Sequence, residues 1–122
     1  MRITLFSFGY KHGPAEADTV LDMRFLPNPF YVPEMKAGTG LEKRISDYVL
    51  KNRTAAEFLA LLEPVLLTYI ANHHKAGRAS LRLAVGCTGG RHRSVAVTEY
   101  LRGVLNKSTH ELMVYHRDID KE

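Results

Sequence analysis

Short runs of apolar residues alternate along this chain with longer segments in which apolar residues recur every three or four positions. Runs of strand length, with β-branched and aromatic residues, cover 3–8, 19–24 and 81–85. Residues 110–116 alternate apolar and polar side chains, as a half-buried strand does. We therefore expect four strands, and 81–85 is apolar enough to lie in the middle of a sheet.

Three helices are expected between these strands. A Thr followed three residues later by Glu, the spacing of a capping box, occurs at Thr39 and at Thr54, each just before a segment with helical periodicity. We expect the first helix to end near Lys51 and the second near residue 74. A third helix is expected over residues 94–105.

The order of elements, β, β, α, α, β, α, β, predicts a three-layer α/β fold. Its sheet should be mostly parallel, with about four strands and flanking helices. A length of 122 residues fits one domain, 1–122. Right-handed crossovers then place the loops after strands 3–8 and 81–85 at the same edge of the sheet.

The strongest local signal is the glycine-rich stretch 86–94, GCTGGRHRS, which joins a strand to a helix. A strand, a tight loop and a helix in that order form an anion site, because loop amides and the helix dipole face one spot. Gly89 and Gly90 permit positive φ and the close approach of a ligand. Arg93 adds a planar cation that suits phosphate, and Ser94 is a candidate to cap the helix or contact the anion.

Composition indicates the class of protein, and the charge distribution indicates the sign of charge that a partner would carry. The chain is 45% hydrophobic and 25% charged, which is ordinary for a globular protein, and its net charge is +4. Residues 81–117 carry six Lys and Arg against two acidic side chains, so the positive field gathers near the glycine-rich loop. A mildly basic surface with no anionic partner is the alternative, because nucleic-acid binders usually carry denser basic stripes.

The chain lacks signals for export or oxidation. A single cysteine excludes an internal disulfide and fits a reducing compartment. The first apolar run is too short for a signal peptide, and no run approaches the roughly 18 apolar residues of a membrane span. These features predict a soluble, cytoplasmic protein without membrane contact.

Two further loops supply candidate site residues. Lys11 and His12 follow the first strand and are placed to face the same crevice as Arg93, with a solvated surface loop as the alternative. Phe30 and Tyr31 lie in a long, proline-rich connection that cannot be helical. They are candidates for a pocket wall or for a contact in a homodimer, with packing over the core as the alternative.

A catalytic hypothesis is also open. Cys87 and Arg93 are separated by five residues and followed by Ser94, the spacing of cysteine-dependent phosphatases. There a thiolate attacks phosphorus while the arginine and loop amides hold the phosphate oxygens. Glycine precedes the cysteine where tyrosine phosphatases usually have histidine, and only Asp22 and Asp118 stand out as proton donors. A small buried hydrophobe at a strand end is the alternative role for the cysteine.

Other sites are excluded by spacing. The chain has no nucleotide P-loop, no dinucleotide-binding fingerprint and no serine-hydrolase elbow. His12, His92 and His116 are scattered, and would form a metal site only by a coincidence of the tertiary fold. We therefore expect neither a metal nor a cofactor.

Several motifs together resemble the C-terminal domain of the RNase adapter protein RapZ. They are SFGYKHG at 7–13, DMRFLPNP at 22–29, TGL at 39–41, GCTGGRHRSV at 86–95 and HR at 116–117. They occur in the order of that domain and span nearly the whole chain. The resemblance implies a phosphosugar-sensing domain that binds glucosamine 6-phosphate and a regulatory small RNA, and presents the RNA to an endoribonuclease.

By position, His12, Thr88, Gly89 and Arg93 match the sugar-phosphate pocket of the family. With the loop residues derived above, the predicted ligand-binding set is His12, Thr88, Gly89, Gly90, Arg93 and Ser94. Full-length members carry an N-terminal P-loop domain that this chain lacks, so no nucleotide hydrolysis is expected of it.

Three functional hypotheses follow, in this order. The first is a sensor or adapter domain, not an enzyme, that binds a sugar phosphate such as glucosamine 6-phosphate or another anion. The second is the phosphatase with Cys87 and Arg93 as catalytic residues. The third is RNA binding through the basic residues Arg82, Arg91, Arg102, Lys107 and Arg117. RNA-binding members end in a Lys/Arg-rich tail, whereas this chain ends DIDKE, which weakens the third hypothesis.

Overall fold

The computed structural model of the chain describes residues 1–122 as four strands, three α-helices and two short 3-10 helices. The elements are β1 (Arg2–Gly9), η1 (Tyr10–His12), β2 (Thr19–Asp22), η2 (Pro29–Tyr31), α1 (Lys43–Leu50), α2 (Arg53–Lys75), β3 (Ser80–Cys87), α3 (Arg93–Leu105) and β4 (Glu111–His116). The predicted α/β fold is confirmed, and every predicted strand and helix is present.

The four strands form one parallel sheet in the order β2-β3-β1-β4. The apolar strand β3 is internal, as predicted, and in its register with β1 the last residues of the two strands, Gly9 and Cys87, stand opposite each other. Because the strands are parallel, all their carboxyl ends lie at one edge. The loops after β1 and β3 therefore meet, as the crossover rule predicts.

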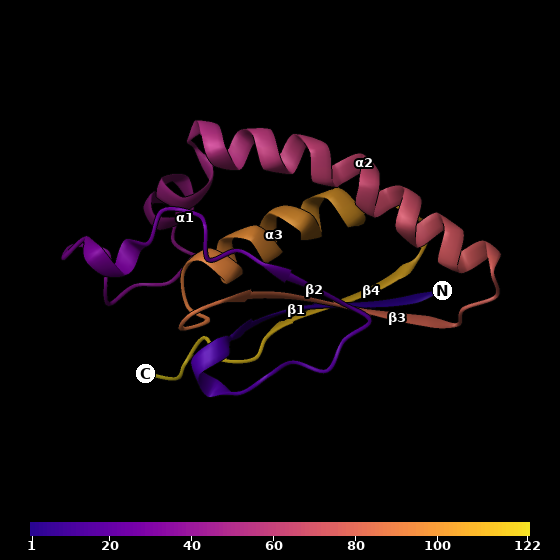
Figure 1. Cartoon of the computed structure of the whole chain (residues 1–122), viewed down its shortest axis with the longest axis horizontal. Helices are drawn as coiled ribbons and strands as arrows, with labels where there is room; N and C mark the ends of the chain where they lie inside the picture. Colours follow the sequence, from indigo (N-terminus) through magenta and orange to yellow (C-terminus); the bar gives the residue numbers. More distant parts are fainter.

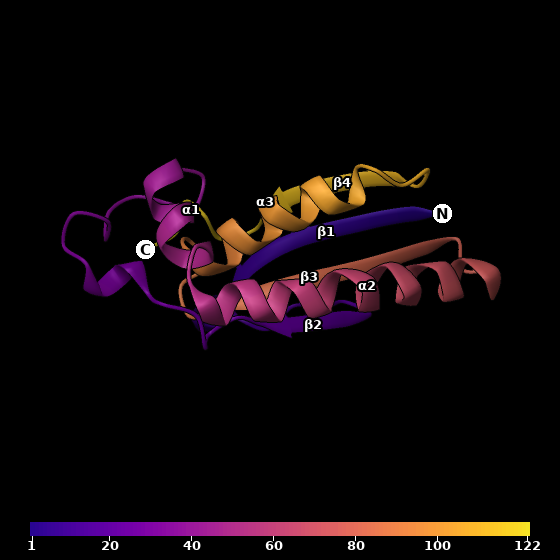
Figure 2. The same cartoon turned by 90° about the horizontal axis from the view of Figure 1, so that it is seen from above.

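The layers differ from the prediction in one respect. All three α-helices lie on one face of the sheet (Figure 1), with α2 running beside α3 above it (Figure 2). The third layer, on the opposite face, is the irregular segment 10–18 and contains no α-helix. It covers Phe6, Phe8 and Ala84, against which Tyr10, Ala15 and Ala17 pack. The flanking helices are thus confined to one side.

The main core lies between the sheet and the helices. Its strand residues include Ile3, Leu5, Leu81, Leu83 and Val85, all fully buried. These side chains alternate with residues that point to the opposite face, as the two-residue period of a strand requires. Burial of this kind stabilises a domain by about 25 cal/mol per Å² of apolar surface, and it fixes the positions of the strand ends that carry the loops.

Both predicted helix starts need correction. The carboxylate of Glu42 accepts the Thr39 amide at 2.9 Å, but α1 itself begins only after Glu42. α2 begins at Arg53, because the Asn52 side chain caps it by accepting the Ala55 amide at 3.0 Å. A capping oxygen next to the helix start satisfies an otherwise unpaired amide, and here Asn52 supplies it instead of Thr54.

One helix, α2, is long and apolar enough to cross a membrane by length and composition. The expectation that no segment reaches this length is therefore wrong by that criterion. Leu59, Leu66 and Ile70 of α2 are buried in the core shared with the sheet. Core helices of soluble proteins and membrane spans both meet the criterion, so composition alone assigns α2 to neither class.

Candidate functional site

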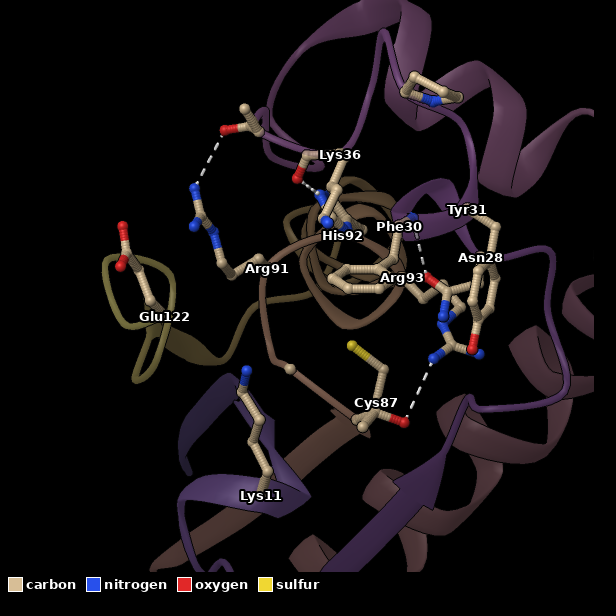
Figure 3. A pocket seen from close by; sticks show the side chains of 14 residues that line it. Lys11, Asn28, Phe30, Tyr31, Lys36, Cys87, Arg91, His92, Arg93 and Glu122 are labelled. Atoms are coloured by element: carbon tan, nitrogen blue, oxygen red, sulfur yellow. Dashed lines mark hydrogen bonds between the residues drawn. The ribbon is translucent and has the colours of Figure 1, made fainter.

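A cavity of about 650 Å³ opens at the carboxyl edge of the sheet. Its lining residues are Lys11, Asn28, Phe30, Tyr31, Pro33, Lys36, Ala37, Cys87, Thr88, Gly89, Arg91, His92, Arg93 and Glu122. Four of these are Lys or Arg and one is acidic, so the cavity favours an anion. Figure 3 shows Lys11, Arg91 and Glu122 on one side of it and Arg93, Asn28 and Tyr31 on the other.

The glycine-rich loop forms the floor by packing backbone against backbone on the end of β1. Gly90 has φ +76°, and a Cβ there would lie 2.5 Å from the Gly9 nitrogen. A Cβ on Gly9 would collide with the Gly89 carbonyl carbon. Only Gly90 of the two loop glycines uses positive φ. A Cβ on Gly89 would meet only Lys11 Cε, at 3.9 Å, so the close approach requires glycine at Gly9 and Gly90.

Arg93 is the first residue of α3 and is 5% exposed. Its Nη1 donates to the Arg24 carbonyl at 2.7 Å and to the Leu26 carbonyl at 3.4 Å, and its Nη2 lies 3.4 Å from Thr88 Oγ1. Its Nε is buried without a hydrogen-bond partner. A buried charged donor without an acceptor is costly, so a ligand oxygen that reached Nε would relieve this cost.

The segment after β2 holds this arginine in place. Arg24, whose carbonyl accepts from Arg93, makes a forked contact to Asp22 with a shortest distance of 2.7 Å, and its guanidinium carbon lies 4.0 Å from the centre of the Tyr10 ring. The hydrogen bond from Arg24 lowers the pKa of Asp22. The sequence left Asp22 and Arg24 as either site residues or a local ion pair. In the structure their ion pair supports the backbone that orients Arg93.

Cys87 and Ser94 contact each other beneath the loop. The thiol donates to Ser94 Oγ at 3.1 Å, and the Ser94 amide donates to the sulfur at 3.4 Å. Ser94 is fully buried inside α3 and does not line the cavity. The prediction that Ser94 caps the helix is therefore wrong, because α3 begins one residue earlier, at Arg93. Contact of Ser94 with an anion stays a prediction, and in the structure its hydroxyl accepts from the Cys87 thiol.

Neither proposed proton donor suits the phosphatase hypothesis. Burial acts to raise the pKa of Asp118, but hydrogen bonds from Arg117, the Gly9 amide and Lys121 outweigh it and lower that pKa to about 2. The pKa of Asp22 is lowered as well. A general acid needs a pKa near the working pH, and both carboxyl groups are ionised at neutral pH.

The same contacts predict loss of stability in acid. Because the folded pKa of Asp118 is about 2, below the usual value near 3.9, its contribution is fully present above about pH 4 and is lost as pH falls toward 2. A shift of this size corresponds to about 2 kcal/mol. Urea unfolding at pH 7, 4 and 2 should show this loss in the native chain. In Asp118→Asn the change between pH 4 and pH 2 should be smaller by that amount, and an unchanged pH dependence would contradict the assignment.

The sequence predicted the same role for Lys11 and His12, facing the crevice, and the structure separates them. Lys11 lines the cavity, and its amide donates to the Thr88 carbonyl at 3.1 Å. His12 is not among the lining residues, and its Nε2 is buried without a partner. Direct contact of His12 with a ligand stays a prediction of the family resemblance. The structure gives the cavity a lysine at this place instead.

The remaining wall comes from residues that sequence reasoning left open or missed. Phe30 and Tyr31 line the cavity from η2, and Lys36 Nζ lies 4.5 Å from the centre of the Phe30 ring. Their predicted alternative role in a homodimer stays a prediction. His92 Nε2 lies 3.1 Å from the Lys36 carbonyl, and burial lowers the pKa of His92. No sequence signal pointed to Asn28, Lys36 or Glu122, whose placement depends on the tertiary fold.

The five basic residues proposed for RNA come from different elements of the fold. Arg91 is at the cavity, where its Nη2 donates to the Ala37 carbonyl at 3.2 Å. Arg102 pairs with Glu99 on α3, and Arg117 pairs with Asp118. Arg82 lies over Phe6, on the sheet face away from the helices. Lys107 follows α3. RNA contact by this set stays a prediction.

No group of three or more His, Cys, Asp or Glu side chains is close enough to hold a metal ion. The charged side chains that line the cavity are four Lys and Arg against one Glu, which suits an anion rather than a cation. The arrangement can therefore bind and orient an oxyanion with a ring-sized body attached.

Comparison with known proteins gives consistent matches over the whole chain. A family model described as the RapZ C-terminal domain matches residues 1–120. A nucleotide-binding protein of Caldicellulosiruptor saccharolyticus is 47% identical over all of this chain, and one of Clostridium botulinum is 42% identical over all of it. One of Bacillus thuringiensis is 46% identical over 98% of the chain. The chain covers only 41–42% of these relatives, and so spans about two fifths of their length.

Proposed function

Because this chain belongs to the RapZ C-terminal domain family, we propose that it is a regulatory adapter domain that binds a sugar phosphate such as glucosamine 6-phosphate. The phosphate lies on the glycine-rich loop, and the sugar ring lies toward Phe30 and Tyr31. The domain acts by binding and not by catalysis, and it works in the cytoplasm. In its ligand-bound form it is recognised by a larger partner, such as an RNA or a protein.

The observation that carries the proposal is the buried edge of Arg93. Its Nη1 is held by two backbone carbonyls, so the guanidinium is fixed before any ligand arrives, while its Nε has no partner. The neighbouring Nη2 has only a long contact to Thr88 Oγ1. A rigid guanidinium edge with these two donors matches the spacing of two phosphate oxygens. Pre-organisation of this kind raises affinity because little side-chain freedom is lost on binding.

The shape of the cavity supports a ligand larger than a bare anion. Its volume of about 650 Å³ is in the ordinary range of small-molecule sites. Phe30 is 48% and Tyr31 80% exposed at its wall, which leaves flat apolar surface for a ring. Lys11 and Lys36 add positive charge at the rim, and Asn28 offers amide donors and acceptors to hydroxyl groups.

Binding without turnover is supported by the state of the acidic groups. Asp22 and Asp118, the two proton donors that the phosphatase hypothesis named, are both held in ion pairs and are ionised at neutral pH. The RNA-adapter role rests on the family alone.

The direct test is calorimetric titration of glucosamine 6-phosphate, inorganic phosphate, glucosamine and adenosine monophosphate at equal ionic strength. The nucleotide is included because the relatives are named nucleotide-binding proteins. We expect the sugar phosphate to bind at least about 10-fold more tightly than inorganic phosphate, a difference of about 1.4 kcal/mol that the ring must supply. Equal affinity for the two would reduce the site to a general anion site. Tighter binding of adenosine monophosphate would assign the pocket to a nucleotide instead of a sugar phosphate.

A further inference from the structure

A buried carboxylate stands directly behind the glycine-rich loop, outside the cavity lining. Asp118, two residues beyond β4, is fully buried. Its Oδ2 accepts the amide of Gly9, the last residue of β1, at 2.7 Å. Its two oxygens also accept from Arg117, and Lys121 Nζ lies 2.7 Å from Oδ1. The Asp118 carboxylate therefore joins the end of β1, at Gly9, to the segment after β4, at Arg117 and Lys121.

Arg117 extends the same contacts to the loop after β1. Its Nη2 donates to the Gly13 carbonyl at 2.8 Å, and its Nη1 donates to the Pro14 carbonyl at 2.8 Å. Its own amide donates to the Ser7 carbonyl at 3.0 Å, which continues the ladder between β1 and the chain after β4. The Arg117 guanidinium is thus held by the Asp118 carboxylate and by the Gly13 and Pro14 carbonyls. These bonds also hold the loop that carries Lys11.

Asp118 also lies beside the glycine-rich loop, at Gly90. A Cβ placed on Gly90 would lie 3.0 Å from the Asp118 Cβ and 2.5 Å from the Gly9 nitrogen. The end of β1, the glycine-rich loop and the end of β4 therefore meet at this one carboxylate. Moving Asp118 would release Gly9, and Gly9 packs directly on the backbone of Gly89, a cavity residue.

We propose that Asp118 is a positioning residue for the ligand site, and that Arg117 is its partner in this role. This inference rests on the proposed function of the same cavity. The carboxylate holds the β1 end against the 89–90 backbone, which keeps the loop amides and the Lys11 side chain facing the ligand. It never touches the ligand, and acts only through Gly9 and Arg117.

Asp118→Asn tests the proposal, because asparagine keeps an oxygen for the Gly9 amide and removes the charge that orders Arg117 and Lys121. We expect the affinity for glucosamine 6-phosphate to fall about 10-fold or more, as loss of a charge-assisted network predicts. Arg117→Lys, which keeps the charge but cannot reach two carbonyls and a carboxylate together, should show a smaller loss. This milder variant decides the question if Asp118→Asn does not fold.

Asp18→Asn is the matched control. Asp18 also accepts a backbone amide, that of Arg82 at 2.8 Å, and also pairs with an arginine, Arg78 at 2.9 Å. It precedes β2, at the amino end of the sheet and away from the cavity. It should lower thermal stability and leave the affinity unchanged. Equal affinity of folded Asp118→Asn and the native chain would overturn the proposal, because a merely structural role predicts that result.

A second readout needs no ligand. The Lys11 amide bonds the Thr88 carbonyl, so its hydrogen exchange reports the docking of the β1 loop on the glycine-rich loop. In Asp118→Asn this amide should exchange about 10-fold faster, whereas in Asp18→Asn it should not change. An unchanged rate would refute the positioning role even if the native chain proved not to bind the sugar phosphate. A faster rate together with no binding by the native chain would refute only the proposed function.

Discussion

Replacing Arg93 by alanine should reduce the affinity for glucosamine 6-phosphate by about 100-fold or more. Hydrogen bonds from a charged group contribute about 1.5–3 kcal/mol each, and two such bonds from the Nε edge are lost. The substitution also frees the Arg24 and Leu26 carbonyls and removes the contact to Thr88. The glycine-rich loop then loses both its cation and the side chain that contacts Thr88. Calorimetry on the folded variant measures the effect.

Two further variants separate charge from geometry. Arg93→Lys keeps the charge but cannot hold the Arg24 and Leu26 carbonyls while facing an anion with two donors, so it should recover only a small part of the affinity. Arg102→Ala removes an arginine from the same helix, where it pairs with Glu99 at the surface, and should leave binding unchanged. Native affinity in folded Arg93→Ala would show that the ligand binds elsewhere.

Replacing Gly90 by alanine should destabilise the domain by about 3 kcal/mol or more, since positive φ at a residue with a side chain and an overpacked contact each cost 1–3 kcal/mol. The new Cβ would lie 2.5 Å from the Gly9 nitrogen and 2.8 Å from the Phe8 carbonyl carbon. Both neighbours are backbone atoms of a strand inside the sheet, so they cannot turn aside. The glycine-rich loop must lift, and ligand binding should be lost together with stability.

Gly103→Ala is the control for this substitution. Gly103 lies within α3, and a Cβ there meets nothing within 4 Å. Alanine should therefore stabilise the domain by roughly 0.5–1 kcal/mol through helix propensity, with unchanged binding. Urea unfolding of both variants gives the comparison. Comparable stability of Gly90→Ala and the native chain would mean that the loop does not pack on β1 as described.

The sequence was sufficient to predict the strands, the helices and the glycine-rich loop. Apolar runs and helical periodicity depend on local spacing, so the strand–loop–helix unit around 86–94 and the parallel order of the sheet could be predicted. The side on which the helices lie could not be predicted, because β1 carries apolar residues on both faces and the pattern does not say which segment covers each face. The segment 10–18 covers one face without forming an α-helix, and no periodicity marks it.

The support of Arg93 was beyond sequence reasoning for a related reason. The carbonyls of Arg24 and Leu26 hold it, and a carbonyl carries no residue-type signal. The role of Asp118 was missed because its main partner is the backbone amide of Gly9, 109 residues away in sequence. The cap predicted at Ser94 is wrong for a different reason. Its residue type suited a cap, but α3 begins one residue earlier and the Ser94 hydroxyl accepts from the neighbouring thiol of Cys87.

A crystal structure of the native chain with glucosamine 6-phosphate would locate the phosphate and the sugar ring. We predict phosphate oxygens within hydrogen-bond distance, about 2.7–3.2 Å, of Arg93 Nε and the Gly89 amide, with the sugar ring against Phe30 and Tyr31. Hydrogen bonds from Arg93 to the Arg24 and Leu26 carbonyls should be unchanged. A sugar phosphate bound away from this cavity, or one whose phosphate lies at the aromatic wall with the Arg93 Nε still unpaired, would contradict this prediction.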